Sequence, residues 1–223
     1  TKDNDLTSGL VLDKESVDKK DGKEEYEWIQ GSRSNVSKEY AQTAFTLQKG
    51  DSKITMIFRV FHDGMAYRYE VDGDVNSTDE VTEVTSENSS FILPDDGNIW
   101  TMGQSATYEA GEYTKRSVSS INNRNESYAT PILGEIPTNN GTSWLLLAEA
   151  NVYNEKEPYC ASIFQTKSKS TALQVKFGQY LQQEEDEEYN GKQYSAKYSA
   201  IQSVTMSDVF NTKWMMANLA DTL

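Results

Sequence analysis

The stretch that decides the fold reads Ile54-Thr55-Met56-Ile57-Phe58-Arg59-Val60-Phe61-His62-Asp63-Gly64-Met65-Ala66-Tyr67-Arg68-Tyr69-Glu70-Val71. Large apolar side chains recur in it at every second position, which is the period of a β-strand. A polar turn, His62-Asp63-Gly64, interrupts the pattern near its centre. The residues that share a face are Ile54, Met56, Phe58 and Val60 before the turn, and Met65, Tyr67, Tyr69 and Val71 after it. We therefore predict an antiparallel hairpin of two strands, residues 54–61 and 65–71.

The same period recurs in short runs along the rest of the sequence, and Gly, Asn, Asp and Pro residues separate these runs. The further predicted strands are residues 9–12, 24–29, 40–47, 90–93, 143–150, 159–165, 173–177, 193–198 and 202–206. Aromatic residues are frequent, with 13 Tyr and 4 Trp among 223 residues, as on pleated, half-buried surfaces. The sequence predicts an all-β fold, a large antiparallel β-sandwich, with residues 1–223 forming one domain.

Charge and cysteine content argue against several classes of function. A formal net charge of −14 and a pI near 4.5 repel phosphate backbones, so we expect no nucleic-acid partner. Cys160 is the only cysteine, so an intramolecular disulfide and a cysteine-rich zinc site cannot form. No apolar run approaches the length that crosses a membrane, and we expect no membrane partner.

The sequence also lacks the residues of common catalytic machineries. His62 is the only histidine and lies in a predicted turn, so a serine or cysteine nucleophile has no evident base. The phosphate-binding motifs GxxxxGK[ST] and GxGxxG are missing, which argues against nucleotide chemistry. The acidic run at residues 184–188 lacks the alternating spacing of a calcium loop and is interpreted as a solvated strand end. We expect no complete catalytic site within this chain.

One carboxylate stands out because of the strand that carries it. Residues 143–150 form a nearly continuous apolar run, and Glu149 lies at its end. A carboxylate at the end of a buried strand needs a cation, a hydrogen-bond donor or a partner charge to offset its lost hydration. Glu149 is therefore the first candidate for a functional residue. The alternative is an ordinary strand-end acid whose side chain reaches water.

Arginine and tryptophan residues form a second set of candidates. Arg59, Arg68 and Glu70 lie in the predicted hairpin, where an inter-strand ion pair that supports the fold is the simplest interpretation and substrate binding by Arg59 is the alternative. For the tryptophans, a place in the core or at a domain interface is the simplest interpretation, and a sugar-stacking platform is the alternative. These tryptophans are Trp28, Trp100, Trp144 and Trp214.

Four segments follow one another in the order of a known pattern: residues 6–12, 58–70, 144–151 and 211–214. Residues 58–70 look like the hairpin of the N-terminal domain of glycoside hydrolase family 97. Residues 6–12 are similar to the early Ser–Leu–Gly–Leu segment of that domain, and residues 144–151 resemble its strand ending in Glu-Ala. Asn211-Thr212-Lys213-Trp214 resembles its closing Thr-Pro-Trp-Arg element. The resemblance spans essentially all 223 residues.

The resemblance implies a β-sandwich of the galactose mutarotase-like super-sandwich type, packed against a catalytic (β/α)₈ barrel. Members of the family hydrolyse α-glucosides or α-galactosides in the periplasm or outside the cell, mostly in Bacteroidetes-type bacteria. The resemblance also implies a calcium ion near the reaction centre, held mainly by glutamates of the barrel, with Glu149 as the ligand from the sandwich. Residues expected at the substrate pocket or the domain interface are Trp144, Asn151, Trp214 and Arg59.

The sequence departs from the family pattern at two positions of the closing element. Lys213 stands where the pattern has Pro, and Met215 stands where it has Arg. The sequence contains no barrel, so the general acid, general base or nucleophile would belong to another part of the polypeptide. We expect an N-terminal domain of an α-glycosidase that is inactive alone, with the catalytic barrel as partner and an oligosaccharide as substrate. The alternative is a non-catalytic carbohydrate-binding sandwich.

Overall fold

The hairpin predicted from the sequence lies in the middle of a large sheet. Its strands are β4 (Ser52–Phe61) and β5 (Gly64–Asp72), which pair antiparallel with Phe58 opposite Tyr67 and Phe61 opposite Gly64. His62 is exposed in the turn between them, as predicted. This computed structural model describes residues 5–27, 29, 34–72, 81–103, 111–121, 125–152, 160–185, 194–200, 204–207 and 209–220.

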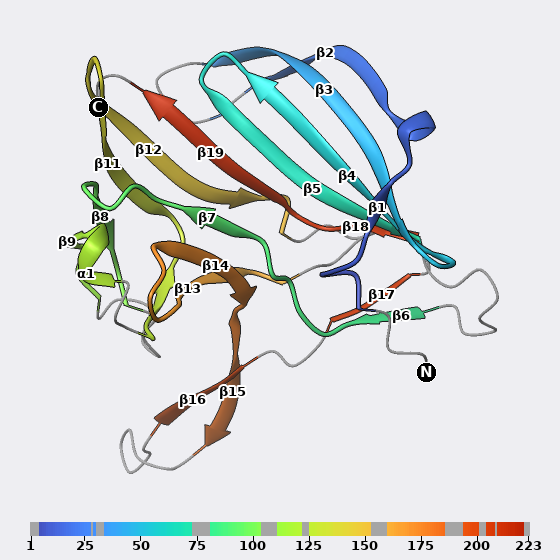
Figure 1. Ribbon diagram of the computed structural model, residues 1–223. Helices are drawn as coiled ribbons and strands as arrows, with labels where there is room; N and C mark the ends of the chain where they lie inside the picture. Colours follow the sequence, from blue (N-terminus) through green and yellow to red (C-terminus); the bar gives the residue numbers. More distant parts are fainter. Residues whose placement is uncertain are drawn as a thin grey trace.

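Across the described ranges, eleven strands form one antiparallel sheet that includes this hairpin (Figure 1). The strands before β4 in the sheet are β1 (Val11–Leu12) and β3 (Asn35–Lys49). The strands that follow β5 are, in order, β19 (Trp214–Ala220), β12 (Gly141–Ala150), β11 (Ile132–Thr138), β8 (Asn98–Thr101) and β9 (Thr114–Ser117). Two more strands attach at the side, β2 (Asp18–Glu27) on β3 and β18 (Val209–Asn211) on β5.

A smaller sheet packs against the inner face of the large one. Its four strands are, in order, β10 (Ser127–Ala129), β13 (Ser162–Thr166), β14 (Ala172–Phe177) and β7 (Ser90–Ile92). Two strand pairs lie outside both sheets: β15 (Gln179–Glu185) with β16 (Tyr194–Ala200), and β17 (Val204–Ser207) with β6 (Val81–Val84). Helical structure among the described residues is limited to the 3₁₀ turn η1 (Lys14–Ser16) and the single turn α1 (Val118–Ile121).

The core lies between the two sheets and is crossed by a line of aromatic rings. Phe58 of β4 contacts Tyr67 of β5, and Tyr67 contacts Phe91 of β7, with ring centroids 6.0 and 6.1 Å apart. Phe91 in turn meets Phe164 of β13 edge to face at 6.0 Å. Such ring pairs stabilise a core beyond the area they bury. Leu147 of β12, which is 1% exposed, packs in the same cluster.

The all-β prediction is confirmed, and each predicted strand coincides at least in part with an observed one. Of the predicted acidic strand end, residues 184 and 185 form the end of β15, and residues 186–188 lie outside the described residues. The sequence pattern missed β6, β8, β9, β10, β11, β18 and β19, and of β15 it indicated only the acidic end. β19 is apolar at most positions and therefore shows no alternation, as expected for a central strand with side chains packed on both faces. Among the described residues, no helix is long and apolar enough to span a membrane.

Candidate functional site

The Glu149 carboxylate lies between the two sheets. Antiparallel pairing places Glu149 opposite Met215 of β19, a core residue, so its side chain points to the inner face. The backbone N–H of Ser162 in β13 donates to both carboxylate oxygens, at 3.2 Å to Oε1 and 2.9 Å to Oε2. The Thr130 hydroxyl donates to Oε1 at 3.3 Å. The Glu149 side chain is only 10% exposed and is held by protein donors, which favours the interpretation that a donor and a partner charge offset its lost hydration.

Lys213 supplies the cation that a buried Glu149 carboxylate requires. Its Nζ lies 3.7 Å from Glu149 Oε2 and donates a 2.9 Å hydrogen bond to the carbonyl oxygen of Cys160. The Lys213 side chain is 0% exposed. Thr212 fixes the preceding backbone: its N–H donates to the Tyr69 carbonyl at 2.8 Å, and its hydroxyl accepts from the Tyr69 N–H at 3.0 Å. β5 therefore positions the lysine that faces Glu149.

A second carboxylate, Glu87, reaches the same ammonium group. Glu87 lies just before β7; its Oε2 is 3.7 Å from Lys213 Nζ, and its side chain is 5% exposed. The Ser89 hydroxyl donates to Glu87 Oε1 at 3.3 Å and lies 2.9 Å from the Tyr69 hydroxyl. We call Glu87, Glu149 and Lys213 the Lys213 cluster. It connects β12 and the start of β19 in the large sheet with the segments that lead into β7 and β13.

The electrostatics of the Lys213 cluster are dominated by the loss of water. Burial raises the pKa of both the Glu87 and the Glu149 carboxyl, because a carboxylate loses hydration between the sheets. The Lys213 ammonium opposes this and lowers both pKa values, and the hydrogen bonds from Ser162 act in the same direction on Glu149. Because water cannot screen these charges, each one depends strongly on its partners.

The immediate surroundings of Glu149 do not fit a calcium ion. Both carboxylate oxygens already accept protein hydrogen bonds, and the Lys213 ammonium lies beside Oε2, where a cation would repel it. Calcium prefers about six to eight oxygen ligands. Within the described ranges, no group of three or more His, Cys, Asp and Glu side chains could hold a metal ion. The calcium role that the resemblance implies for Glu149 stays a prediction.

Arg59 and Trp214 meet on the outer face of the large sheet. The guanidinium carbon of Arg59 lies 4.4 Å from the centre of the Tyr40 ring and 4.6 Å from the Trp214 ring. Arg68 stacks on the same tryptophan at 4.7 Å. Arg59 also forms an inter-strand ion pair, with Glu24 of β2. We call Arg59, Tyr40, Arg68 and Trp214 the outer-face cluster.

Trp144 and Asn151 lie apart from both clusters. Trp144 is half-buried and packs on Trp100 with ring centroids 5.5 Å apart, and Lys115 Nζ lies 4.7 Å from the Trp100 ring centre. Asn151 is exposed directly after β12 and has a φ of 55°, a left-handed conformation that asparagine tolerates better than most residues. Asn151 thus turns the chain away from the sheet. Trp28 lies outside the described residues.

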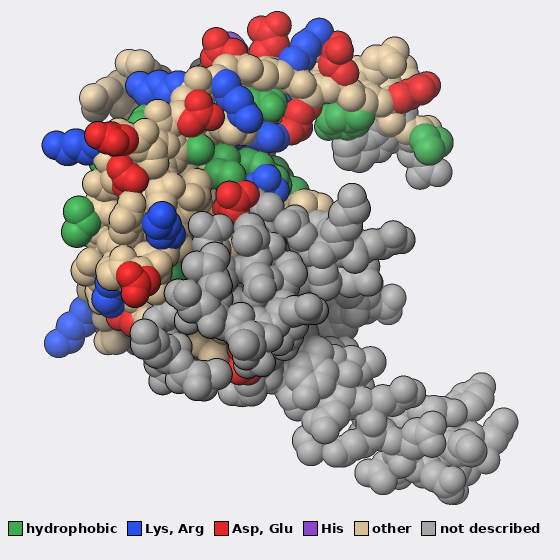
Figure 2. Space-filling view, turned by 90° about the vertical axis from the view of Figure 1, so that its right-hand side faces the viewer, with side chains coloured by type: hydrophobic (Ala, Val, Ile, Leu, Met, Phe, Trp, Pro, Cys, Tyr) green, Lys and Arg blue, Asp and Glu red, His purple; other side chains and the backbone are tan. Residues whose placement is uncertain are grey.

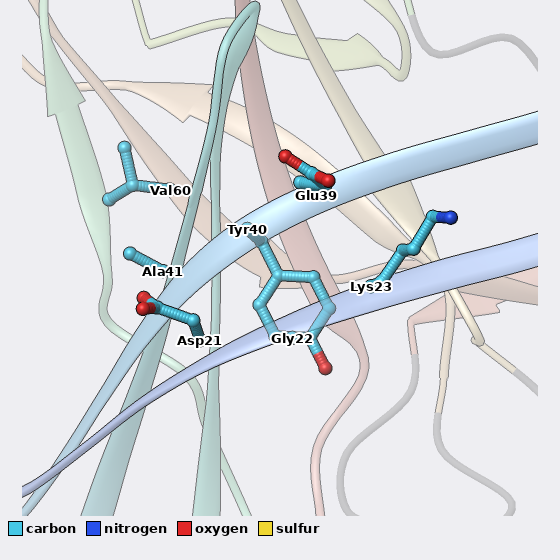
Figure 3. A pocket seen from close by; sticks show the side chains of 7 residues that line it. All are labelled: Asp21, Gly22, Lys23, Glu39, Tyr40, Ala41 and Val60. Carbon is cyan, nitrogen blue, oxygen red and sulfur yellow. The ribbon is translucent and has the colours of Figure 1, made fainter.

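A shallow, open hollow of about 600 Å³ lies beside the strands β2 and β3, and Figure 3 shows the side chains that line it. These are Asp21, Gly22, Lys23, Glu39, Tyr40, Ala41 and Val60. The Tyr40 ring lies across Gly22, where a Cβ atom would collide with it. The hollow is lined by acidic and basic side chains, Asp21, Glu39 and Lys23, so it favours neither an anionic nor a cationic ligand.

Sequence reasoning identified Glu149 but not the residues that surround it. Glu87 and Lys213 are distant from Glu149 in the sequence, while Cys160 lies just before the next strand, β13, and the fold brings them together. One signal was available: Lys213 is a single cation beside the apolar run of β19, and a charge in such a place calls for a carboxylate partner. Nothing in the sequence indicates which of the 35 Asp and Glu residues that partner is.

Solved structures with a similar fold include two of a glycoside hydrolase family 97 enzyme from Pseudoalteromonas sp. strain K8. The complex with acarbose has a TM-score of 0.66 at 16% identity, over 95% of this chain and 28% of that chain. A complex of a variant with panose gives 0.64 at 16% identity, over 96% and 30%. A β-arabinopyranosidase gives 0.63 at 19% identity, over 95% and 32%. This chain therefore spans about a third or less of each of these proteins.

The family assignment comes from a different comparison, since identities this low establish only a shared fold. No curated protein matches the chain. The family model described as glycosyl-hydrolase 97 N-terminal matches residues 2–222, which is nearly the whole sequence. With its large antiparallel sheet and smaller inner sheet, the chain belongs to the N-terminal domain family of glycoside hydrolase 97.

Proposed function

We propose that this chain is the N-terminal sandwich of an α-glycoside hydrolase, that it packs against the catalytic domain, and that it forms part of the wall of the sugar-binding pocket. The observation that carries the proposal is the family match over residues 2–222. The similar structures in complex with acarbose and panose support an α-glucoside as substrate class. An enzyme with such substrates is expected in the periplasm or outside the cell.

The outer-face cluster is the surface that we assign to contact with the catalytic domain or its sugar. Its Arg, Trp and Tyr side chains are the types that contribute most of the binding energy at interfaces. Arg59 is held by Glu24 and stacked between two rings, so little side-chain freedom is lost when a partner docks. Figure 2 shows one face of the molecule, on which hydrophobic side chains gather under the upper edge with charged side chains around them.

The calcium ligand that the resemblance implies for Glu149 is not needed for this proposal. A sandwich domain can form part of the pocket through packing alone. The test below therefore includes a chelator, because a shared calcium site makes activity sensitive to chelation and packing alone does not.

The proposal is tested by expressing the chain together with its natural continuation and assaying hydrolysis of p-nitrophenyl sugars. The substrates are the α-glucoside, the α-galactoside and the β-arabinopyranoside, each with and without EDTA. We expect hydrolysis of an α-linked substrate by the longer protein and none by the 223-residue chain. Absence of hydrolysis of all three substrates would contradict the proposal.

A variant pair separates the interface role from folding. We expect Trp214→Ala in the longer protein to lower kcat/KM by about tenfold, which corresponds to about 1.4 kcal/mol, because an anchor of the interface is lost. Val60→Ala is the control, since Val60 lies in the same sheet on β4, two strands away from β19, and is 57% exposed. Both proteins must show the same circular dichroism spectrum. Equal kcat/KM values for the two variants would exclude the outer-face cluster from the interface.

The second candidate is a non-catalytic carbohydrate-binding sandwich. The observation that favours it is the Trp100–Trp144 pair, whose half-buried rings could stack on a sugar. Affinity-gel electrophoresis on starch and arabinan tests this function. Retardation of the 223-residue chain that is lost in Trp144→Ala would support it, and unretarded migration on both polysaccharides would exclude it for these ligands.

A further inference from the structure

The Lys213 cluster places one ammonium group between two carboxylates in the interior. Lys213 Nζ lies 3.7 Å from both Glu87 Oε2 and Glu149 Oε2, and the lysine side chain is 0% exposed. We propose that the Lys213 ammonium is the permanent counter-cation of Glu87 and Glu149, in place of a metal ion, and that Glu149 is a positioning residue for β13. This inference does not depend on the proposed enzymatic function.

The space around the Glu149 carboxylate is occupied by protein hydrogen-bond donors and by Lys213. Oε1 accepts hydrogen bonds from Thr130 and Ser162, and Oε2 accepts the shorter bond from the Ser162 N–H at 2.9 Å. Lys213 Nζ approaches Oε2 to 3.7 Å. A divalent cation at this oxygen would lie within a few ångströms of a like charge in a site that excludes water, where repulsion is largest. The ammonium and a metal ion therefore exclude each other.

Lys213 and Glu149 both form hydrogen bonds to the backbone at the start of β13. Lys213 donates to the Cys160 carbonyl, and Glu149 accepts from the Ser162 N–H. The two hydrogen bonds hold the backbone on either side of Ala161, at the start of β13. One comes from Glu149 in β12 and the other from Lys213, directly before β19. Glu149 and Lys213 thus connect the large sheet to the small sheet and position the start of β13.

Glu87 completes the cluster from the side of the small sheet. Its Oε2 forms no hydrogen bond in the structure, so the Lys213 ammonium is the group that stabilises this buried oxygen. Its other oxygen accepts from Ser89. Removal of the ammonium would leave two buried carboxylates close together with only hydrogen-bond donors to stabilise them. An added cation would then gain a site that is closed to it in the wild-type chain.

The test compares the melting temperature of the wild-type chain with that of Lys213→Ala in EDTA, calcium chloride and ethylammonium chloride at neutral pH. We expect the wild-type Tm to be the same in all three solutions. We expect the Tm of Lys213→Ala in EDTA to be about 10 °C lower than that of the wild-type chain, because the substitution leaves the buried carboxylates without a counter-charge. Calcium or ethylammonium should recover part of this loss. Lys115→Ala is the matched control, since Lys115 also pairs with a carboxylate, Glu135 at 2.7 Å, but is 49% exposed and should show neither effect.

Two results would overturn the proposal: a calcium-induced rise in the wild-type Tm, or a Lys213→Ala variant that melts like the wild type. If Lys213→Ala does not fold, the wild-type chain decides the question by nuclear magnetic resonance with ¹⁵N-labelled lysine. A slowly exchanging side-chain ammonium signal that is absent from Lys213→Arg supports the proposal. Ammonium protons that all exchange rapidly with water would contradict it.

Discussion

Lysine is almost never fully buried unless a carboxylate accompanies it, and Lys213 has two. Glu149 could be singled out from the sequence because an apolar strand ends on it, and the requirement for a cation and a donor followed from its burial. The sequence did not show which residues supply this cation and this hydrogen-bond donor. Lys213 reaches Glu149 through the pairing of strands that are distant in the sequence, and the Ser162 N–H does so from the next strand along the chain, β13. Local sequence carries no information about such contacts.

Cys160 offers a prediction at the scale of a single residue. Burial raises the pKa of its thiol to about 11, and the residue is 7% exposed. A raised thiol pKa means that the reactive thiolate is scarce at neutral pH and increases as the pH rises towards 11. We expect iodoacetamide at pH 8 to alkylate Cys160 at least about a hundredfold more slowly than an unhindered cysteine, with the rate rising about tenfold per pH unit.

Mass spectrometry of the intact chain measures this alkylation rate. The control is the same chain in concentrated urea, where the thiol is exposed and should react at the rate of a free cysteine. Fast alkylation of the native chain at pH 8 would show that Cys160 is not buried as described.

At the scale of elements, β19 holds the two halves of the large sheet together. It pairs with β5 on one side and β12 on the other. Met215 points into the core, while Trp214 stacks on the outer face, so both faces of this strand are in contact. A strand of this kind has no apolar and polar alternation, which is why the period-two pattern did not predict it. The hairpin β4–β5 was predicted because apolar residues recur at every second position in both of its strands and a polar turn separates them.

Gly64 tests the contact between β5 and β19. A Cβ atom at Gly64 would lie 2.5 Å from the Ala217 carbonyl oxygen and 2.8 Å from Asn218 Cα, both backbone atoms that cannot move aside. We expect Gly64→Ala to lower the free energy of unfolding by about 2 kcal/mol, in the range for overpacked sites. Urea denaturation followed by circular dichroism measures the change.

Gly103→Ala is the control for this substitution, because a Cβ atom there would meet nothing within 4 Å. Its effect should stay below about 0.5 kcal/mol, as for surface substitutions. If Gly64→Ala were as stable as this control, the close approach of β5 and β19 would be wrong.

At the scale of the whole molecule, the two sheets are joined by an apolar core and by the Lys213 cluster. The aromatic line from Phe58 to Phe164 crosses from one sheet to the other. The Lys213 cluster adds charged contacts between the same sheets. Apolar packing accounts for most of the stability in such a sandwich, and the buried charges contribute mainly through the cost of separating them.

Leu147 tests the apolar core. It is 1% exposed and faces the small sheet, so Leu147→Ala should lower the free energy of unfolding by about 3 kcal/mol through lost burial and the cavity that remains. Leu146→Ala is the matched control: the residue is next along β12, points to the outer face and is 39% exposed. We expect the control to lose less than about 1 kcal/mol. Equal losses in urea denaturation would mean that the two faces of β12 are assigned wrongly.

The sequence by itself determined the class of fold and the family. Alternation with period two is a local property, since each strand shows its buried face in its own residues. The family segments are likewise continuous stretches, such as residues 58–70 and 144–151. Only the tertiary structure decided which strands are neighbours and that Lys213 meets Glu149 and Glu87. The physical reason is that a buried charge requires an opposite charge or a hydrogen-bond donor as its partner, which can be stated from the sequence. Which residue supplies that partner depends on the pairing of strands that are distant in the sequence.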